Sequence, residues 1–388
     1  MAHLHSTITS MAFALAVLLL GTQTTLAAER NLNLELDQEA LKLAWTFDTG
    51  KAFNIVPTVG NGKVYAIAVG GVLNAFNPKT GHVDWTYDPK EGLWDRSLTV
   101  DGDQLFVCYK GGKFAALNAS DGAVQWETDI GINCQRPHHV DGDTVYVSTT
   151  FVGPGLPGDP LTGAKLFAIN RHNGHIKWEL KTEEYLLQTA TSRDGTIFLA
   201  GNYIDTSHED TEGGPAHYYA VDQETGKIKW TYKSEDGTPK LLIATEQNLL
   251  FSAYNDFIQA LDKNTGELLW KRDSNNWLPG FSVDDKNIYL SSATTIVHSW
   301  PINGEGENWR FNIPGKKFDY LLTKPTLVNE RIYFMSQRGY VYALNKATGK
   351  QIFRYESGMN SRVGLTYSDG YVYMNDSKGR VYGYKIMK

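Results

Sequence analysis

The sequence predicts an all-β protein, an eight-bladed β-propeller whose last blade is completed by both ends of the chain. Three observations lead to this prediction. One segment recurs along the chain, and its aromatic anchor returns at spacings of 39 to 52 residues. The 388 residues include 37 Gly, 21 Tyr, 16 Phe and 10 Trp, a composition typical of short strands joined by tight turns.

The recurring segment is an apolar strand ending in Asn or Asp, a turn with Gly, and a strand that carries an aromatic anchor. Its copies are NAFNPKTGHVDW (74–85), AALNASDGAVQW (115–126), FAINRHNGHIKW (167–178), YAVDQETGKIKW (219–230), QALDKNTGELLW (259–270), the degenerate HSWPINGEGENW (298–309) and YALNKATGKQIF (342–353). The anchors are Trp45, Trp85, Trp126, Trp178, Trp230, Trp270, Trp309 and Phe353. Eight anchors at this period indicate four strands per blade, with each anchor wedged between blades.

A second hairpin precedes each copy. Its turns are Asn61-Gly62, Asp101-Gly102, Asp141-Gly142, Asp194-Gly195 and Asp369-Gly370. Both residues of such pairs suit the left-handed positions of a two-residue hairpin turn. Each blade is therefore expected to run strand A, turn, strand B, loop, strand C, Gly turn, strand D.

The two ends of the repeat region are complementary. Residues 41–48 (LKLAWTFD) form a D strand with no preceding A, B or C strand, and residues 360–388 supply three strands without a fourth. Pairing them completes one blade and removes the exposed edge of an open ring. Residues 41–388 are therefore expected to be one propeller domain, preceded by a polar lead-in at 28–40.

Residues 1–27 are interpreted as a secretory signal peptide. The apolar run MAFALAVLLLG (11–21) precedes small residues at Thr25 and Ala27, where we expect cleavage. An N-terminal membrane anchor is the alternative, but 11 apolar residues give about 16 Å of helix against a hydrocarbon core of about 30 Å. No Cys follows the run to take a lipid anchor. We therefore expect a periplasmic or secreted protein without a transmembrane segment.

Charge and cysteine content narrow the class further. The 43 acidic residues exceed the 37 basic ones, which gives a net charge of −6, and 41% of residues are hydrophobic. This composition excludes a disordered chain and argues against nucleic acid as a partner. Cys108 and Cys134 are the only cysteines. In an oxidising compartment they could pair across neighbouring blades, or both could be buried free thiols.

The unit VYALNKATGKQIF (341–353) resembles the PQQ-like repeat, and the resemblance extends over nearly all of residues 41–388. That family includes quinoprotein alcohol dehydrogenases and the lipoprotein of the outer-membrane β-barrel assembly machinery, so the resemblance implies a fold more than a function. The dehydrogenases carry a vicinal disulfide over the quinone. Because Cys108 and Cys134 lie 26 residues apart, we expect no PQQ and no other cofactor, with a divalent cation as the alternative.

A ligand site is expected on the face that carries the B–C and D–A connections. Two long B–C segments, 151–164 and 203–216, lie on adjacent blades. The D–A connections bring cations and aromatic rings to the same rim, which suits an anionic or sugar-like ligand. The candidate ligand-binding residues are Trp94, Arg96, Arg136, Lys240, Trp277, Tyr320 and Arg362. Alternatively, the cations pair with Asp95, Glu184 and Asp319.

The segment Gln135-Arg136-Pro137-His138-His139 is the strongest candidate for catalysis. Strand alternation sends His138 and His139 to opposite faces, so they cannot share one metal, but either could act as a general base. With Tyr185 and Arg136 they resemble the catalytic groups of propeller polysaccharide lyases. The tentative catalytic residues are His138, His139 and Tyr185.

Metal binding is a weaker possibility. His208, Glu209, Asp210 and His217 follow or lie within the blade-4 insertion and offer oxygen and imidazole ligands, although a solvated acidic loop is the simpler interpretation.

The leading functional prediction is a rigid scaffold for cell-envelope or outer-membrane assembly, whose partner is an envelope protein or an anionic polysaccharide. The alternative is a secreted carbohydrate-active enzyme, a lyase acting on a uronate-containing polysaccharide. A quinone-dependent dehydrogenase is the third hypothesis.

Overall fold

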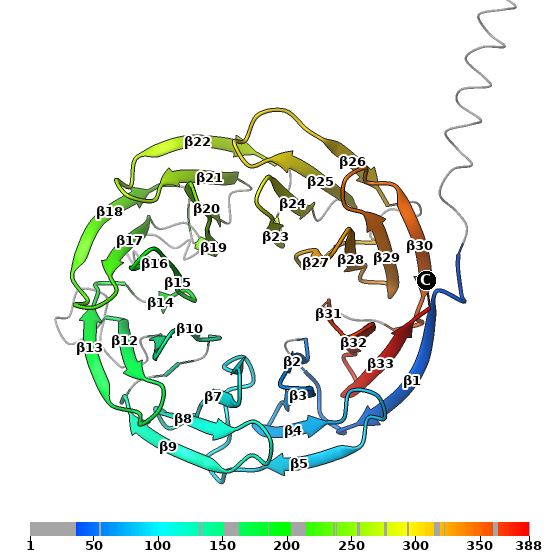
Figure 1. Cartoon of the computed structure of the whole chain (residues 1–388), viewed down its shortest axis with the longest axis horizontal. Coiled ribbons are helices and arrows are strands. Elements are labelled where there is room, and N and C mark those ends of the chain that lie inside the picture. The colour runs from blue at the N-terminus through cyan, green and yellow to red at the C-terminus, as the bar shows by residue number, and fades with distance from the viewer. Residues whose placement is uncertain are drawn as a thin grey trace, which may run out of the picture.

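The structure is a computed structural model. It describes residues 36–387 apart from 54–55, 132, 135, 151–162, 185, 203–214, 236, 238, 254–256, 275–277, 293–294, 314–318, 322 and 360–363. In this part of the chain, 33 strands form eight antiparallel sheets arranged in a ring (Figure 1). The predicted eight-bladed propeller is confirmed.

We number the blades 1 to 8 and letter their strands A to D from the centre outward. The first four blades are β2 (Thr58–Gly60), β3 (Lys63–Ala68), β4 (Val72–Phe76) and β5 (Val83–Tyr87); β6 (Thr99–Asp101), β7 (Gln104–Cys108), β8 (Lys113–Asn118) and β9 (Val124–Asp129); β10 (His139–Asp141), β11 (Thr144–Ser148), β12 (Lys165–Asn170) and β13 (Ile176–Lys181); and β15 (Thr191–Arg193), β16 (Thr196–Asn202), β17 (Ala216–Asp222) and β18 (Ile228–Ser234), with β14 (Leu186–Leu187) also paired to β16.

The last four blades follow the same order. They are β19 (Pro239–Ala244), β20 (Asn248–Ala253), β21 (Phe257–Asp262) and β22 (Leu268–Asp273); β23 (Gly280–Val283), β24 (Asn287–Ser292), β25 (Ile296–Pro301) and β26 (Trp309–Asn312); β27 (Thr326–Val328), β28 (Arg331–Met335), β29 (Tyr340–Asn345) and β30 (Gln351–Glu356); and β31 (Leu365–Ser368), β32 (Tyr371–Asn375), β33 (Arg380–Ile386) and β1 (Leu41–Asp48).

Blade 8 joins the two ends of the repeat region, as predicted. β1 pairs antiparallel with β33, with Leu41 opposite Ile386 and Asp48 opposite Arg380. The pairing closes the ring, so no blade is left without a neighbour. We call the side that carries the A–B and C–D turns the turn face, and the side that carries the B–C and D–A connections the loop face.

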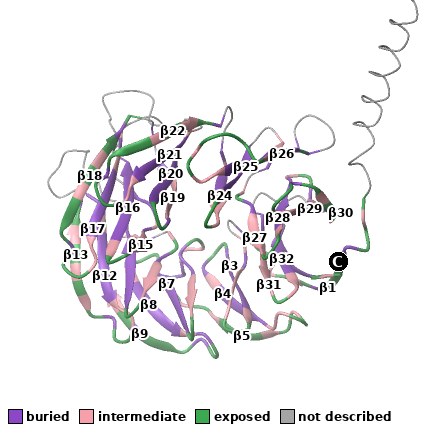
Figure 2. Ribbon diagram, turned by 45° about the horizontal axis from the view of Figure 1, so that its top comes forward, coloured by how far each residue is buried: buried purple, intermediate pink, exposed green. Residues whose placement is uncertain are grey.

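Burial follows the position of each strand in its blade. The B strands are buried throughout, as in β7 and β11, because blades pack against both of their faces. The D strands, such as β5 and β22, alternate or face solvent, since they form the outer rim (Figure 2). The core is consequently divided into eight apolar clusters, most of them shared by two neighbouring blades.

A repeated contact joins neighbouring blades along the turn face: the Trp ring of one D strand packs on a glycine in the C–D turn of the next blade. We call this contact the indole latch. Trp126 of β9 lies against the C–D turn of blade 3, where a Cβ on Gly174 would come within 2.6 Å of the ring. Its Nε1–H donates to the Arg171 carbonyl at 2.7 Å. The same ring–glycine contact recurs for Trp45, Trp85, Trp178, Trp230, Trp270 and Trp309 with Gly81, Gly122, Gly226, Gly266, Gly304 and Gly349. The predicted wedge is therefore confirmed at seven junctions of the described structure.

Phe353 occupies the eighth anchor position. It packs with Ala40, Leu41 and Tyr384 in the closing blade. No C–D turn exists there, because the C and D strands of blade 8 come from opposite ends of the chain. Blade 8 therefore offers no turn carbonyl to accept from an indole N–H. Phe353, whose ring has no N–H donor, leaves no polar group unpaired at this position.

Hydroxyl groups make a second set of latches near the centre. Thr99 Oγ1 of blade 2 donates to the His138 carbonyl of blade 3 at 3.0 Å. Equivalent bonds link blades 6 to 7, 7 to 8 and 8 to 1: Ser282 to Pro325, Thr326 to Leu365, and Thr366 to Pro57.

The A–B turns follow two patterns. Asn61-Gly62, Asp194-Gly195 and Asp369-Gly370 have positive φ at both residues, as predicted. The prediction was wrong for Asp101 and Asp141, which end strands β6 and β10. There the positive φ falls on Gly102 and Gly142, so the turn begins one residue later.

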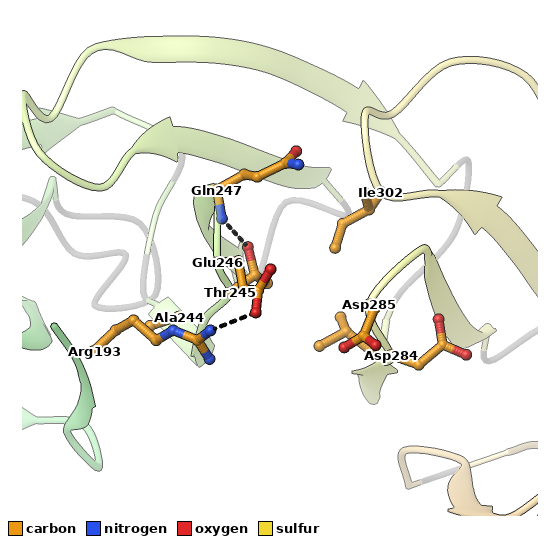
Figure 3. Close-up of a pocket in the computed structure, with 9 residues that line it drawn as sticks. Arg193, Ala244, Thr245, Glu246, Gln247, Asp284, Asp285 and Ile302 are labelled. Carbon is orange, nitrogen blue, oxygen red and sulfur yellow. Dashed lines mark hydrogen bonds and ion pairs between the residues drawn. The ribbon is translucent and has the colours of Figure 1, made fainter.

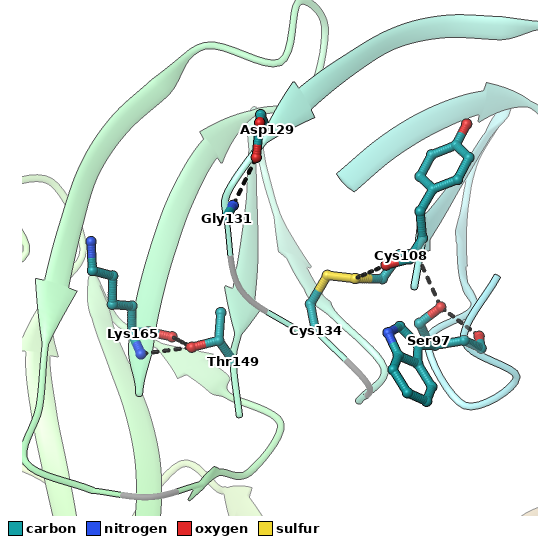
Figure 4. Close-up of a disulfide and its surroundings, with 9 residues drawn as sticks. Ser97, Cys108, Asp129, Gly131, Cys134, Thr149 and Lys165 are labelled. Carbon is teal, nitrogen blue, oxygen red and sulfur yellow. Dashed lines mark hydrogen bonds between the residues drawn. A yellow bond between two sulfur atoms is a disulfide. The ribbon is translucent and has the colours of Figure 1, made fainter. Parts of the chain in front are cut away.

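Cys108 and Cys134 form a disulfide with a Cα–Cα distance of 5.8 Å (Figure 4). Both residues are fully buried. The bridge links the end of β7 in blade 2 to the connection that enters blade 3, and it decides between the two alternatives left open by the sequence.

Candidate functional site

The two long B–C segments start from one place on the loop face, the junction of blades 3 and 4. Residues 151–162 and 203–214 lie outside the described structure, but the residues that follow them are placed. Ala164 donates its N–H to the Glu184 carbonyl at 2.7 Å, and His217, which follows the second segment, contacts the Glu184 side chain. Glu184 therefore ties together the bases of both insertions.

Glu184 is a buried carboxylate with two donors on one oxygen. The side chain is 1% exposed, and its Oε1 accepts from Tyr219 Oη at 2.7 Å and pairs with His217 Nδ1 at 2.6 Å. Oε2 is buried with no hydrogen-bond partner among the described residues. Burial, followed by the charge of Glu184, raises the pKa of Tyr219. The phenol therefore remains protonated and acts as a donor.

This arrangement orients the imidazole of His217. Nδ1–H of His217 donates a hydrogen bond to the carboxylate. In this tautomer Nε2 is left as an acceptor, on a side chain that is 28% exposed. Carboxylate–histidine pairs of this kind orient metal ligands and general bases. From the sequence, His217 was expected only as a possible metal ligand, and Glu184 only as a possible ion-pair partner of the rim cations. The i, i+2 spacing of His217 and Tyr219 on β17 was the available signal that they share a face.

The predicted ligand-binding residues are spread around the loop face. Arg96 is exposed, Trp94 is half-buried beneath Lys110 Nζ at 6.0 Å from its ring, and Lys240 Nζ donates to the Leu278 carbonyl at 3.3 Å. Arg136 and Tyr320 are half-buried and already engaged within the protein. Trp277, Arg362 and Tyr185 lie outside the described residues. The ligand-binding role of the five that are placed stays a prediction.

Among the described contacts Glu184 and Asp319 have other partners, and the alternative that rim cations pair with Asp95, Glu184 and Asp319 stays a prediction. Glu184 takes His217, and buried Asp319 accepts the Arg338 backbone N–H at 3.0 Å.

His138 is not placed for catalysis, which corrects the sequence-based interpretation. It is 4% exposed and packs edge-on against Phe114, with ring centroids 4.6 Å apart. Among the described residues neither ring nitrogen has a hydrogen-bond partner, and burial lowers the pKa of His138 to about 3. A ring enclosed between blades 2 and 3 cannot reach a polysaccharide on the loop face.

His139 faces the opposite way, toward blade 4, as strand alternation predicted. Its Nε2 lies 2.7 Å from Ser192 Oγ, and Ser192 donates to Asp141 Oδ2 at 2.6 Å. Because Ser192 donates its hydroxyl proton to Asp141, its oxygen can only accept from His139. His139 Nε2–H is therefore the donor. This order is the reverse of a Ser-His-Asp catalytic triad. His139 therefore links β10 of blade 3 to β15 of blade 4 through Ser192.

The described residues carry no group of three or more His, Cys, Asp and Glu side chains that could hold a metal ion. His208 and Asp210 lie outside the described structure, so the metal hypothesis built on them stays a prediction. In the part of the chain that is placed, no helix has the length and apolar character needed to cross a membrane.

The fold and its indole latches define a repeat propeller of the PQQ-like class. The family described as "Outer membrane protein assembly factor BamB" matches residues 17–135, 131–252 and 255–387, and the chain belongs to this family.

Individual relatives agree in length as well as in sequence. The outer membrane protein assembly factor BamB of Escherichia coli strain K12 is 24% identical over 359 residues, covering 87% of each chain. The crystal structure of BamB from Moraxella catarrhalis has a TM-score of 0.63 at 19% identity, covering 89% of this chain and 98% of that one. A quinohemoprotein alcohol dehydrogenase from Comamonas testosteroni has a TM-score of 0.65 at 14% identity, covering 92% and 78%.

Proposed function

We propose that the protein is a periplasmic scaffold that takes part in the assembly of outer-membrane proteins. The observation that carries the proposal is the match to the assembly-factor family from residue 17 to residue 387, together with a relative of that name aligned over 87% of both chains. Residues 1–27 would act as the secretory signal that delivers the propeller to this compartment.

The junction of blades 3 and 4 on the loop face is our candidate for the partner-binding surface. Two long segments leave from bases that Glu184 holds together, and loops on a rigid scaffold are common binding elements. Rigidity lowers the entropic cost of binding, because the bases of the segments are ordered before the partner arrives. The partner is expected to be an envelope protein, and the proposal requires no cofactor.

A deletion strain tests the function. Without the gene, outer-membrane β-barrel proteins should fall in abundance when quantified in membrane fractions, and the full-length chain should restore them. Unchanged abundance in the deletion strain would refute the proposed function.

A loop variant tests the surface. Replacing residues 203–214 by a Gly-Ser linker of equal length should abolish rescue and copurification of the partner, while thermal unfolding stays unchanged. A matched control is Asn61→Asp on the turn face, which keeps a residue tolerant of positive φ and should rescue fully. Full rescue by the loop variant would place the partner surface elsewhere on the propeller.

A further inference from the structure

A pocket of about 170 Å³ opens on the turn face, between blades 4, 5 and 6 (Figure 3). Ala244, Val283 and Ile302 form its apolar wall, and Arg193, Glu246 and Asp285 bring charge to it. Sites for small organic ligands usually measure about 300 to 1,000 Å³. The pocket is therefore matched to a single long side chain.

The repeat indicates what chemistry is missing from this pocket. Ile302 is the residue of the blade-6 C–D turn whose N–H bonds to the A–B turn of its own blade, at Lys286 O. Arg171 in blade 3 and Lys346 in blade 7 make the same backbone bond, to Asp143 O and Glu330 O. These three residues therefore hold equivalent positions.

At three of these turn positions a basic side chain reaches back to a carboxylate of the preceding blade. Arg171 pairs with Asp101 at 2.8 Å, and Lys346 pairs with Asp284 at 3.2 Å. Lys263 of blade 5 contacts Asp194 in the same way. Ala119 in blade 2, Gln223 in blade 4 and Ile302 in blade 6 hold the same turn position without a charge. Of these three, Ile302 is the one that lines the pocket.

The remaining charges around the pocket leave one carboxylate uncompensated. Glu246 pairs with Arg193 at 3.1 Å, and Asp284 is taken by Lys346. Asp285 is exposed and makes no ion pair or hydrogen bond within the described structure. An apolar wall beside an unpaired carboxylate suits a side chain with an aliphatic stem and a cationic end.

We propose that this pocket binds a basic side chain, arginine or lysine, of a partner polypeptide. The stem lies against Val283 and Ile302, and the charged end meets Asp285. The external residue thus brings a cation to this junction, as Arg171, Lys263 and Lys346 do from within the chain at three others, but its carboxylate partner, Asp285, belongs to blade 6 itself. The site lies on the face opposite the surface considered above, and it does not depend on the proposed function.

Methyl NMR of the full propeller tests the proposal, because Val283 and Ile302 report from inside the pocket. The probe is the capped tripeptide Gly-Arg-Gly, compared with Gly-citrulline-Gly, which replaces the guanidinium by a neutral urea of similar shape. We expect the arginine peptide to shift both methyl signals with low-millimolar affinity and the citrulline peptide to leave them unchanged. Asp285→Asn should weaken binding about two- to fivefold.

Ile302→Lys supplies the missing cation internally and should abolish the response at Val283. Gln223→Lys is the matched control, since Gln223 holds the same turn position in blade 4 and donates to the Gly195 carbonyl through its N–H; it should bind the peptide normally. Equal shifts from both peptides, or no shift at all, would overturn the proposal. A stronger response to free cadaverine than to the peptide would identify a small-amine site instead and would also overturn it.

Discussion

The two faces of the propeller are held together in different ways. On the turn face one contact, an indole against a turn glycine, recurs at seven junctions. On the loop face the two junctions that carry distinctive contacts differ from each other: a disulfide joins blades 2 and 3, and a buried Glu–His–Tyr cluster lies between blades 3 and 4. The repeated face makes the ring stable, and the other face is thereby free to differ from blade to blade.

The largest effect is expected from breaking one indole latch. Trp126→Ala should lower the free energy of unfolding by about 3 to 5 kcal/mol, because a 9%-exposed ring is lost from a blade junction. Trp94 on the loop face is half-buried, and its Nε1 has no hydrogen-bond partner in the described part of the chain, so Trp94→Ala should cost only about 2 kcal/mol. Urea denaturation measures both. Equal losses would contradict the distinction between the faces.

The disulfide is the next largest contribution. Closing a loop between residues 26 apart stabilises the fold by about 3.5 kcal/mol in the chain-entropy description. Protein reduced in urea and then refolded should unfold at correspondingly lower denaturant than oxidised protein. The Cys108→Ala/Cys134→Ala double variant should match the reduced form and show no response to reductant. A response in that variant would mean that the reductant acts elsewhere.

A smaller, pH-dependent effect should come from His138. Its folded pKa of about 3 lies below the ordinary value of 6.5, so the unfolded chain binds the proton more readily between these values. The contribution of neutral His138 to the free energy of unfolding is fully present above pH 6.5 and is lost as the pH falls. From pH 6.5 to 5 the wild type should lose about 1.5 kcal/mol more stability than His138→Leu. Parallel pH profiles would show that His138 takes up a proton as readily in the folded as in the unfolded protein.

The periodic part of the structure could be predicted from the sequence, and the contacts between blades only in part. Trp spacing and Gly turns specify strands and blade number, since each blade solves the same packing problem. Strand alternation correctly separated His138 from His139. It could not show that an inner strand is covered by a blade on each side, so His138 was placed at the rim when it lies against Phe114.

The Glu184 cluster and the pocket at Ile302 depend on single residues that break the repeat. Glu184 contacts His217 across 33 residues, and no local pattern announces such a pair. Ile302 lies in the degenerate copy at 298–309, at a turn position that is basic in three of the other copies. The sequence could not show that Ile302 lines a pocket, because the carboxylates that this residue faces come from the A–B turns of blades 5 and 6.

The pairing of β1 with β33 has a consequence for biosynthesis. The strand that leaves the ribosome first among the 33 acquires its partner only when the final strand has been made. During synthesis β1 remains a strand without its partner, and the ring cannot close until β33 has been made. Truncating even the last strand should therefore leave an open, protease-sensitive chain rather than a seven-bladed ring.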